Sequence, residues 1–156
     1  MALYHFSVRH VSRGKGQMVV ASAAYIFGQR IFDSYYNKIH DYTSKSGVVF
    51  TEILTPEYVP ERLTDRETLW NEVEHVERNN KAQLAYSFDI ALQNELTLEE
   101  NIRMAKEFCQ EQFVARGMIV DLAVHEGKSD NEEEPDNPHF HVLVPLRPFT
   151  EEGIWG

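Results

Sequence analysis

The stretch from Asn137 to Val144 constrains the fold of this chain more than any other. It reads Asn-Pro-His-Phe-His-Val-Leu-Val, so imidazoles alternate with apolar side chains. On a β-strand, residues two apart point to the same side of the sheet. His139 and His141 would therefore share one face, while Phe140 would enter a core. The pattern predicts a half-buried strand with two histidines on its polar face.

A second strand is predicted just upstream, over residues 118–125. Apolar side chains occupy every second position, and His125 ends the opposite face. If the two strands pair as an antiparallel hairpin across the loop 126–138, His125 lies beside His139 and His141. Three neutral imidazoles that leave positions open for water or substrate suit a borderline divalent metal ion. The alternative is three histidines on a half-exposed sheet face without a ligand.

Hydrophobic periodicity elsewhere predicts the rest of the architecture. Residues 33–47 are polar and are typical of a loop, whereas Thr64–Glu67 and Thr97–Glu100 have the form of helix capping boxes. The order β, α, β, α, β, α, β, β favours an α+β fold: a largely antiparallel sheet of about five strands, helices mainly on one face and the active site on the other. The further predicted elements are strands at 3–11, 47–54 and 82–92, and helices at 18–32, 64–79 and 97–116.

Two other side chains are candidates for chemistry near the histidines. Asp89 lies on the small, polar side of the strand 82–92, where its carboxylate could accept a ring N–H and fix a histidine tautomer. The alternative is a carboxylate that simply faces water. Tyr25 lies off the apolar stripe of its helix, among small and polar residues, which would leave its phenol exposed. Tyrosines on helices also serve as amphipathic packing.

Length and charge set further bounds. The 156 residues fit a single domain with its own core. The one cysteine, Cys109, excludes an intrachain disulfide and fits a reducing cytoplasm, and with no membrane-length apolar run we expect no membrane insertion. The net charge of −10 argues against nucleic acid, but residues 1–48 carry +4 and the remainder −14. A phosphate-binding surface would use the N-terminal third, while the acidic run 130–136 is expected to be a solvated loop.

These residue types together suit phosphoryl chemistry. A divalent ion held by neutral ligands keeps its full charge and can polarise a phosphoryl oxygen. A phenol with a pKa of about 10 becomes a nucleophile when deprotonated, which nearby positive charge favours. Its attack on a phosphodiester would give a phosphotyrosine, release a hydroxyl and conserve the bond energy.

Several motifs carry a resemblance that covers nearly the whole chain: Tyr4–Val8, Gly16-Gln17 with Ala21–Tyr25, Tyr86–Leu92, Glu111–Gly117, Ala123–His125 and Asn137–His141. With them the chain resembles the relaxases of the MobA/MobL type, the nicking enzymes of plasmid and conjugative-element mobilisation. These belong to the HUH endonucleases, in which U is hydrophobic, as Phe140 is between the two histidines.

The resemblance implies roles for the candidate residues. Tyr25 matches the nucleophile that attacks one phosphodiester of single-stranded DNA at a transfer origin, stays on the 5′ end and leaves a 3′ hydroxyl. His125, His139 and His141 match the metal ligands, usually for Mg²⁺ or Mn²⁺. Asp89 falls where such relaxases carry an acidic residue near the histidines.

The resemblance also implies a setting. It predicts a bacterial cytoplasmic protein that travels with DNA into the recipient, with relaxosome accessory proteins and a type IV secretion coupling protein as further candidate partners. Relatives continue past residue 156, so residues 1–156 are expected to be one catalytic domain at the N-terminal end of a longer protein. Many relatives have arginine after the tyrosine, where this chain has Ile26, so a basic contact is expected to be missing.

Other classes of function stay open on the sequence. A rolling-circle replication initiator or an HUH transposase would share the chemistry and differ in the DNA sequence it nicks. A three-histidine hydrolase using metal-bound water would need no tyrosine. A non-catalytic single-strand-binding module would bind without a metal or a covalent product, its aromatic residues serving as stacking platforms.

Overall fold

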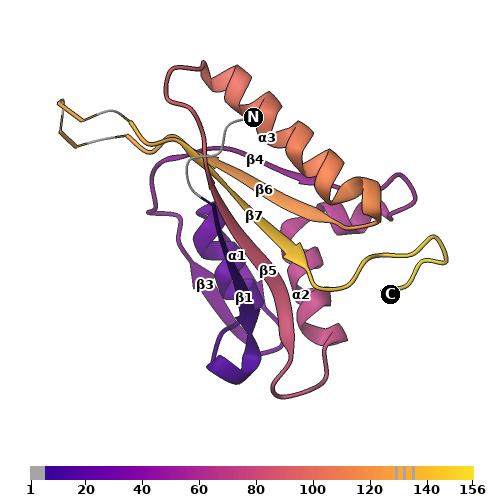
Figure 1. The fold of residues 1–156 in the computed structure, drawn as a ribbon. Coiled ribbons are helices and arrows are strands. Elements are labelled where there is room, and N and C mark those ends of the chain that lie inside the picture. Colours follow the sequence, from indigo (N-terminus) through magenta and orange to yellow (C-terminus); the bar gives the residue numbers. More distant parts are fainter. Residues whose placement is uncertain (1–5, 129, 132, 135) are drawn as a thin grey trace.

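The computed structural model describes residues 6–128, 130–131, 133–134 and 136–156, and its centre is a five-stranded antiparallel sheet (Figure 1). The strand order is β1-β5-β7-β6-β4, with every neighbouring pair antiparallel. The α+β fold with a five-stranded antiparallel sheet is thus confirmed. Positions 3–5 of the first predicted strand lie outside the described residues. The strands are β1 (Phe6–Ser12), β4 (Val48–Leu54), β5 (Gln83–Ala91), β6 (Val120–His125) and β7 (His139–Pro145).

The hairpin of β6 and β7 has the register that the alternation predicts. His125 pairs with His139, and Ala123 pairs with His141. On its other side β7 pairs with β5, which places Asp89 directly opposite His141. Because paired residues share a face, one side of the sheet carries all three histidines and the carboxylate.

The helices cover both faces of the sheet, which corrects the predicted layering. In Figure 1, α3 (Leu98–Gln112) lies on one side and α1 (Val19–Phe27) and α2 (Arg66–Val76) on the other. Leu122 belongs to the core under α3, whereas Ala123 belongs to the core under α1 and α2. The reason is that every residue of β6 is buried, so both of its faces need cover. The histidine face is therefore the α1 and α2 face, not a helix-free one.

The segment after α1 also differs from the prediction. The helix ends at Phe27 rather than near residue 32, because Gly28 adopts φ 64° and its N–H closes the last turn on the Ala24 carbonyl. The predicted loop 33–47 contains part of a two-stranded hairpin, β2 (Arg30–Asp33) and β3 (Lys38–Asp41). Strands of four residues are too short to show a clear alternation.

Of the two predicted capping boxes, the one at α3 is confirmed and the one at α2 is wrong. At α3, Thr97 accepts from the Glu100 amide and the Glu100 carboxylate accepts from the Thr97 amide, as predicted. At α2 the cap is Asp65, which accepts from the Thr68 amide. Thr64 does not cap α2, because it ends a short 3-10 turn and its hydroxyl donates to the Glu61 carbonyl.

A buried ion pair fixes α2 against the histidine face. Arg66 donates to both carboxylate oxygens of Asp121 at 2.7 Å, and the Trp70 indole donates to the same carboxylate at 2.8 Å. The Arg66 guanidinium also lies 4.2 Å from the ring centre of Phe27, at the end of α1. One cluster therefore joins β6, α2 and α1. None of the helices in the described ranges has the length and apolar character needed to cross a membrane.

Candidate active site

The three histidines lie together where β6 ends and β7 begins. The ring centres of His125 and His139 are 4.7 Å apart, and those of His125 and His141 are 6.4 Å apart. His125 is buried, whereas His139 and His141 are half-buried. The hairpin thus brings together the three residues that the sequence suggested as ligands.

The His125 ring is held in one orientation by the end of α1. The Ile26 carbonyl accepts a hydrogen bond from the ring, while Nε2 is buried without a partner among the described residues. The bond therefore uses Nδ1–H, and Nε2 keeps a free lone pair. Burial, helped by the charges of His139 and Lys45, lowers the pKa of His125 to about 4. The imidazole is neutral at neutral pH, as a metal ligand must be.

His141 has a neutral ring with a different partner. Its Nε2 lies 2.7 Å from the Ser87 hydroxyl on the neighbouring strand. Burial lowers its pKa to about 4, although the Asp89 carboxylate acts in the opposite direction. His139 is placed by its own strand end, with Nδ1 3.3 Å from the Asn137 carbonyl. Two of the three rings are therefore held through a described contact at Nδ1, and the third through Nε2.

The cluster fits a divalent ion in its donor set but is not a complete coordination shell. Within the described ranges, no three His, Cys, Asp or Glu side chains already meet the geometry of a metal site. An orphaned, buried and unprotonated Nε2 on His125 is nevertheless what a ligand offers. The histidines present could hold a metal, and their nitrogen donors suit Mn²⁺ and other transition metals better than Mg²⁺.

Asp89 lies in the site without the hydrogen bond that the sequence suggested. It faces His141 across β5 and β7, and Ser7 across β5 and β1. In the described part of the chain the His141 ring bonds to Ser87, not to Asp89. The carboxylate acts on His141 through its charge.

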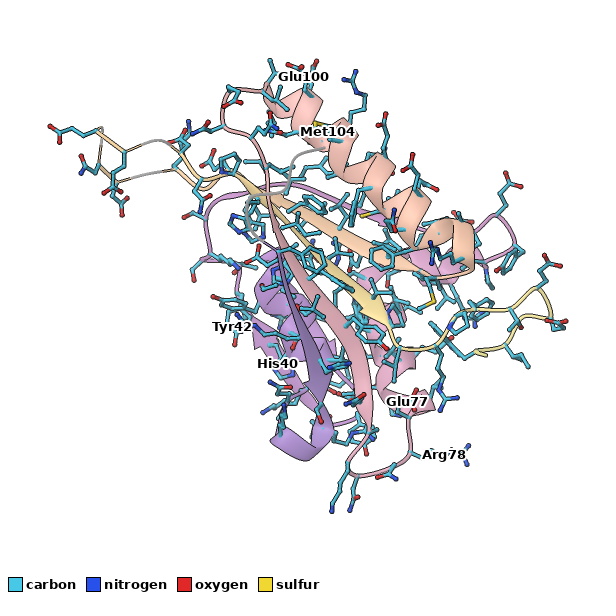
Figure 2. All side chains as sticks on the ribbon, in the orientation of Figure 1. His40, Tyr42, Glu77, Arg78, Glu100 and Met104 are labelled. Carbon is cyan, nitrogen blue, oxygen red and sulfur yellow. The ribbon has the colours of Figure 1, made fainter. Side chains whose placement is uncertain are left out.

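Tyr25 reaches the same cleft from the last turns of α1. Its side chain is 55% exposed, and its ring packs edge-on against Tyr42 at 5.3 Å between centres. Tyr42 follows β3 and lies on the side of the molecule that carries α1 (Figure 2). The Lys45 ammonium lies 3.9 Å from the Tyr25 ring centre. The sequence-based expectation of an exposed phenol on α1 is confirmed.

A cleft of about 420 Å³ joins these side chains. Five of its lining residues are site candidates on the sequence alone. The other four lie on β1, on β5 and in the loop before β4. The lining residues are Ser7, Arg9, Tyr25, Lys45, Ser87, Asp89, His125, His139 and His141.

Some of the missed residues had a signal in the sequence. Ser7 and Arg9 lie on the polar face of a predicted strand. Ser87 lies two residues before Asp89 and therefore shares its face of the strand 82–92. Pairing of β1 with β5 brings these faces together, which strand pattern alone could not specify. Lys45 had only the basic bias of residues 1–48 as a signal, since it lies in a polar loop whose path depends on the β2 and β3 hairpin.

An antiparallel sheet with three clustered histidines, and a helix that presents a tyrosine to them, is the arrangement expected of the relaxase class. A family model described as "MobA/MobL family" matches residues 17–156, and the chain belongs to this family. It is 37% identical to the conjugal transfer protein TraA of Agrobacterium fabrum over 99% of this chain. It is 33% identical to a probable mobilization protein MobA of Bifidobacterium longum and 31% identical to the mobilization protein MobL of Acidithiobacillus ferridurans, each over 99% of this chain.

A solved structure described as "Molecular Basis of Vancomycin Resistance Transfer in Staphylococcus aureus" has a similar fold. It superposes with a TM-score of 0.88 at 37% identity, covering 99% of this chain and 76% of that one. The chain spans only part of its curated relatives: 14% of TraA, 27% of MobA and 41% of MobL.

Proposed function

We propose that this domain nicks single-stranded DNA at a transfer origin, with Tyr25 as the nucleophile. The observation that carries the proposal is the shared cleft, in which an exposed phenol faces the same space as three clustered imidazoles. The Tyr25 Oη forms a bond to phosphorus and the bond from phosphorus to the 3′ oxygen breaks. The phenol loses its proton and the leaving 3′ oxygen gains one. The products are a 5′-phosphotyrosine and a free 3′ hydroxyl.

The cleft residues have complementary proposed roles. His125, His139 and His141 would hold a divalent ion, Mn²⁺ or Mg²⁺, which would supply positive charge to polarise the phosphoryl group. Asp89 is the carboxylate partner of this cluster. Arg9 lines the cleft from β1 and offers a positive charge to the phosphate backbone. The partners and setting implied by the resemblance, namely relaxosome proteins, a secretion coupling protein and the bacterial cytoplasm, belong to the same proposal.

The test is formation of a covalent adduct. The protein is incubated with single-stranded oligonucleotides that cover candidate transfer-origin sequences, with Mn²⁺ or Mg²⁺, and run on a denaturing protein gel. We expect a metal-dependent shifted band that is lost in Tyr25→Phe and with chelator. Tyr42→Phe is the matched control, because Tyr42 is an exposed neighbour in contact with Tyr25.

The same experiment separates the competing classes. Cleavage that survives Tyr25→Phe without an adduct would indicate a hydrolase that activates water, and would overturn the proposal. A band lost in Tyr42→Phe but kept in Tyr25→Phe would make Tyr42 the nucleophile and would overturn the role proposed for Tyr25. Binding without metal dependence or adduct would indicate a single-strand-binding module. A replication initiator or a transposase would give the same adduct on a different DNA sequence.

A further inference from the structure

Lys45 makes two contacts with a single residue, Tyr25. Its ammonium donates a hydrogen bond to the Tyr25 backbone carbonyl at 2.9 Å. The same nitrogen lies 3.9 Å from the centre of the Tyr25 ring, within the range of a cation–π contact. A single positive charge therefore touches both the backbone and the ring of this tyrosine.

The hydrogen bond uses a carbonyl that α1 cannot satisfy itself. The last carbonyls of a helix have no partner within it, and they carry the negative end of its dipole. In α1 the Ala24 carbonyl is closed by the Gly28 and Gln29 amides, the Tyr25 carbonyl by Lys45, and the Ile26 carbonyl by His125. The end of α1 thus ties Lys45 and His125 to consecutive peptide groups.

The loop that carries Lys45 is fixed against the same helix end. The Tyr42 amide donates to the Gln29 carbonyl, and the Lys45 amide donates to the Tyr42 carbonyl. Gly28 packs against the carbonyls of Tyr42 and Lys45. A Cβ added at this glycine would lie 3.8 Å from each of the two carbonyl oxygens. The position of Lys45 over the ring is therefore a consequence of backbone contacts.

Among the described residues, no carboxylate forms an ion pair with Lys45. The ion pairs formed within the described ranges do not include this lysine. Its side chain is half-buried, and burial lowers its pKa. A partly desolvated cation that lacks a counterion acts strongly on the nearest polarisable group, which is the Tyr25 ring.

We propose that Lys45 is a positioning residue for Tyr25, which orients the ring and stabilises the negative charge that develops on it as the phenol attacks phosphate. This inference rests on the proposed function, since it assigns Lys45 to the tyrosine that acts there as nucleophile. The ring of an ionised phenol is more negative than that of a neutral one, so the contact with the ammonium strengthens as the proton leaves. The other charged or titratable groups that line the cleft are Arg9, Asp89, His125, His139 and His141.

Three substitutions separate the parts of this role. Lys45→Met keeps the aliphatic stem and removes both contacts. Lys45→Gln keeps a donor for the Tyr25 carbonyl and removes the charge. Lys45→Arg keeps both. Lys38→Met is the matched control, because Lys38 is an exposed lysine on β3 outside the cleft.

The first readout needs neither metal nor DNA. Near-ultraviolet circular dichroism is recorded at neutral pH for each variant and its Tyr25→Phe partner, so the difference isolates the signal of the Tyr25 ring. We expect this signal to weaken in Lys45→Met and Lys45→Gln, and to be unchanged in Lys45→Arg and Lys38→Met. Equal Tyr25 signals in the wild type and Lys45→Gln would overturn the role of the charge.

The second readout is the single-turnover rate of adduct formation at neutral pH. Lys45→Met and Lys45→Gln should be slower by about tenfold, because the charge that develops on the attacking phenol loses its cation. Lys45→Arg should stay within about threefold of the wild type. A Lys45→Gln rate equal to that of Lys38→Met would overturn the inference. Adducts that persist in Tyr25→Phe would instead overturn the proposed function, while the circular dichroism would still decide the contact between Lys45 and Tyr25.

Discussion

Single residues in this domain are held by contacts that leave one atom free for chemistry. His125 donates through Nδ1 to the Ile26 carbonyl and keeps Nε2 without a partner among the described atoms. Tyr25 is held at its carbonyl and ring while its side chain stays 55% exposed. In both residues the end of α1 provides the hydrogen-bond acceptor. The orientation of both side chains at the site therefore depends on where this helix ends.

The neutral state of the histidines predicts an acid-sensitive fold. His125 and His141 have pKa values lowered to about 4, so the unfolded chain takes up protons first as the pH falls. Their stabilising effect is present above the ordinary histidine pKa and is lost as the pH falls through the folded value. Each should contribute about 2 kcal/mol of destabilisation between about pH 7 and about pH 4.5. Urea unfolding of the metal-free protein at the two pH values measures this.

The control for that effect is a non-titrating substitution. His125→Asn should reduce the difference in unfolding free energy between the two pH values by about 2 kcal/mol. A wild-type protein that is equally stable at both pH values would contradict the assignment of neutral, buried rings.

At the scale of elements, the contact between α2 and β6 depends on a buried ion pair. Asp121 is fully buried and accepts two bonds from Arg66 and one from Trp70. Asp121→Ala would leave the Arg66 guanidinium buried without its carboxylate, at a cost of about 3 to 5 kcal/mol in unfolding free energy. Denaturant unfolding at neutral pH measures this loss.

The matched control is the pair between Arg62 and Glu72, whose arginine side chain is 50% exposed. Arg62→Ala should cost less than about 1 kcal/mol, because exposed ion pairs are screened by water. Equal losses for Asp121→Ala and Arg62→Ala would mean that α2 is held by apolar packing rather than by this pair.

How much of these elements the sequence predicts depends on their patterning. The alternation in β5, β6 and β7 predicted the strands and the shared face of His139 and His141, since side-chain direction is a property of the strand itself. The Thr97 cap of α3 is equally local. The β2 and β3 hairpin was missed because its strands are short. The presence of helices on both faces was missed because the burial of both faces of β6 depends on tertiary packing. Lys45 was missed because its position depends on that unpredicted hairpin.

At the scale of the whole molecule, the basic side chains of the cleft contrast with the negative net charge of the chain. Net charge is −10, yet the cleft contains Arg9 and Lys45. The acidic run 130–136 is exposed at residues 130, 131, 133 and 134, which confirms a solvated loop at those positions. A nucleic-acid partner is therefore expected to meet the cleft, where Arg9 and Lys45 lie.

The basic residues of the cleft predict which charges affect DNA binding. Arg9→Gln should weaken binding of single-stranded oligonucleotides uniformly across sequences and reduce the salt slope by about one. Lys106→Gln on α3, which pairs with Glu52 on the opposite face, should leave both unchanged. Fluorescence anisotropy at several salt concentrations measures the two quantities. Equal losses in the two variants would place the DNA elsewhere.

The most direct test of the account is to map the DNA-bound residue in the adduct. The covalent product formed with a single-stranded transfer-origin oligonucleotide would be digested with protease and nuclease, and the modified peptide sequenced by mass spectrometry. We predict a nucleotide 5′-phosphate on Tyr25, together with a free 3′ hydroxyl on the released strand. Modification of another residue, or a phosphate left on the 3′ end, would contradict Tyr25 as the nucleophile of a transesterification.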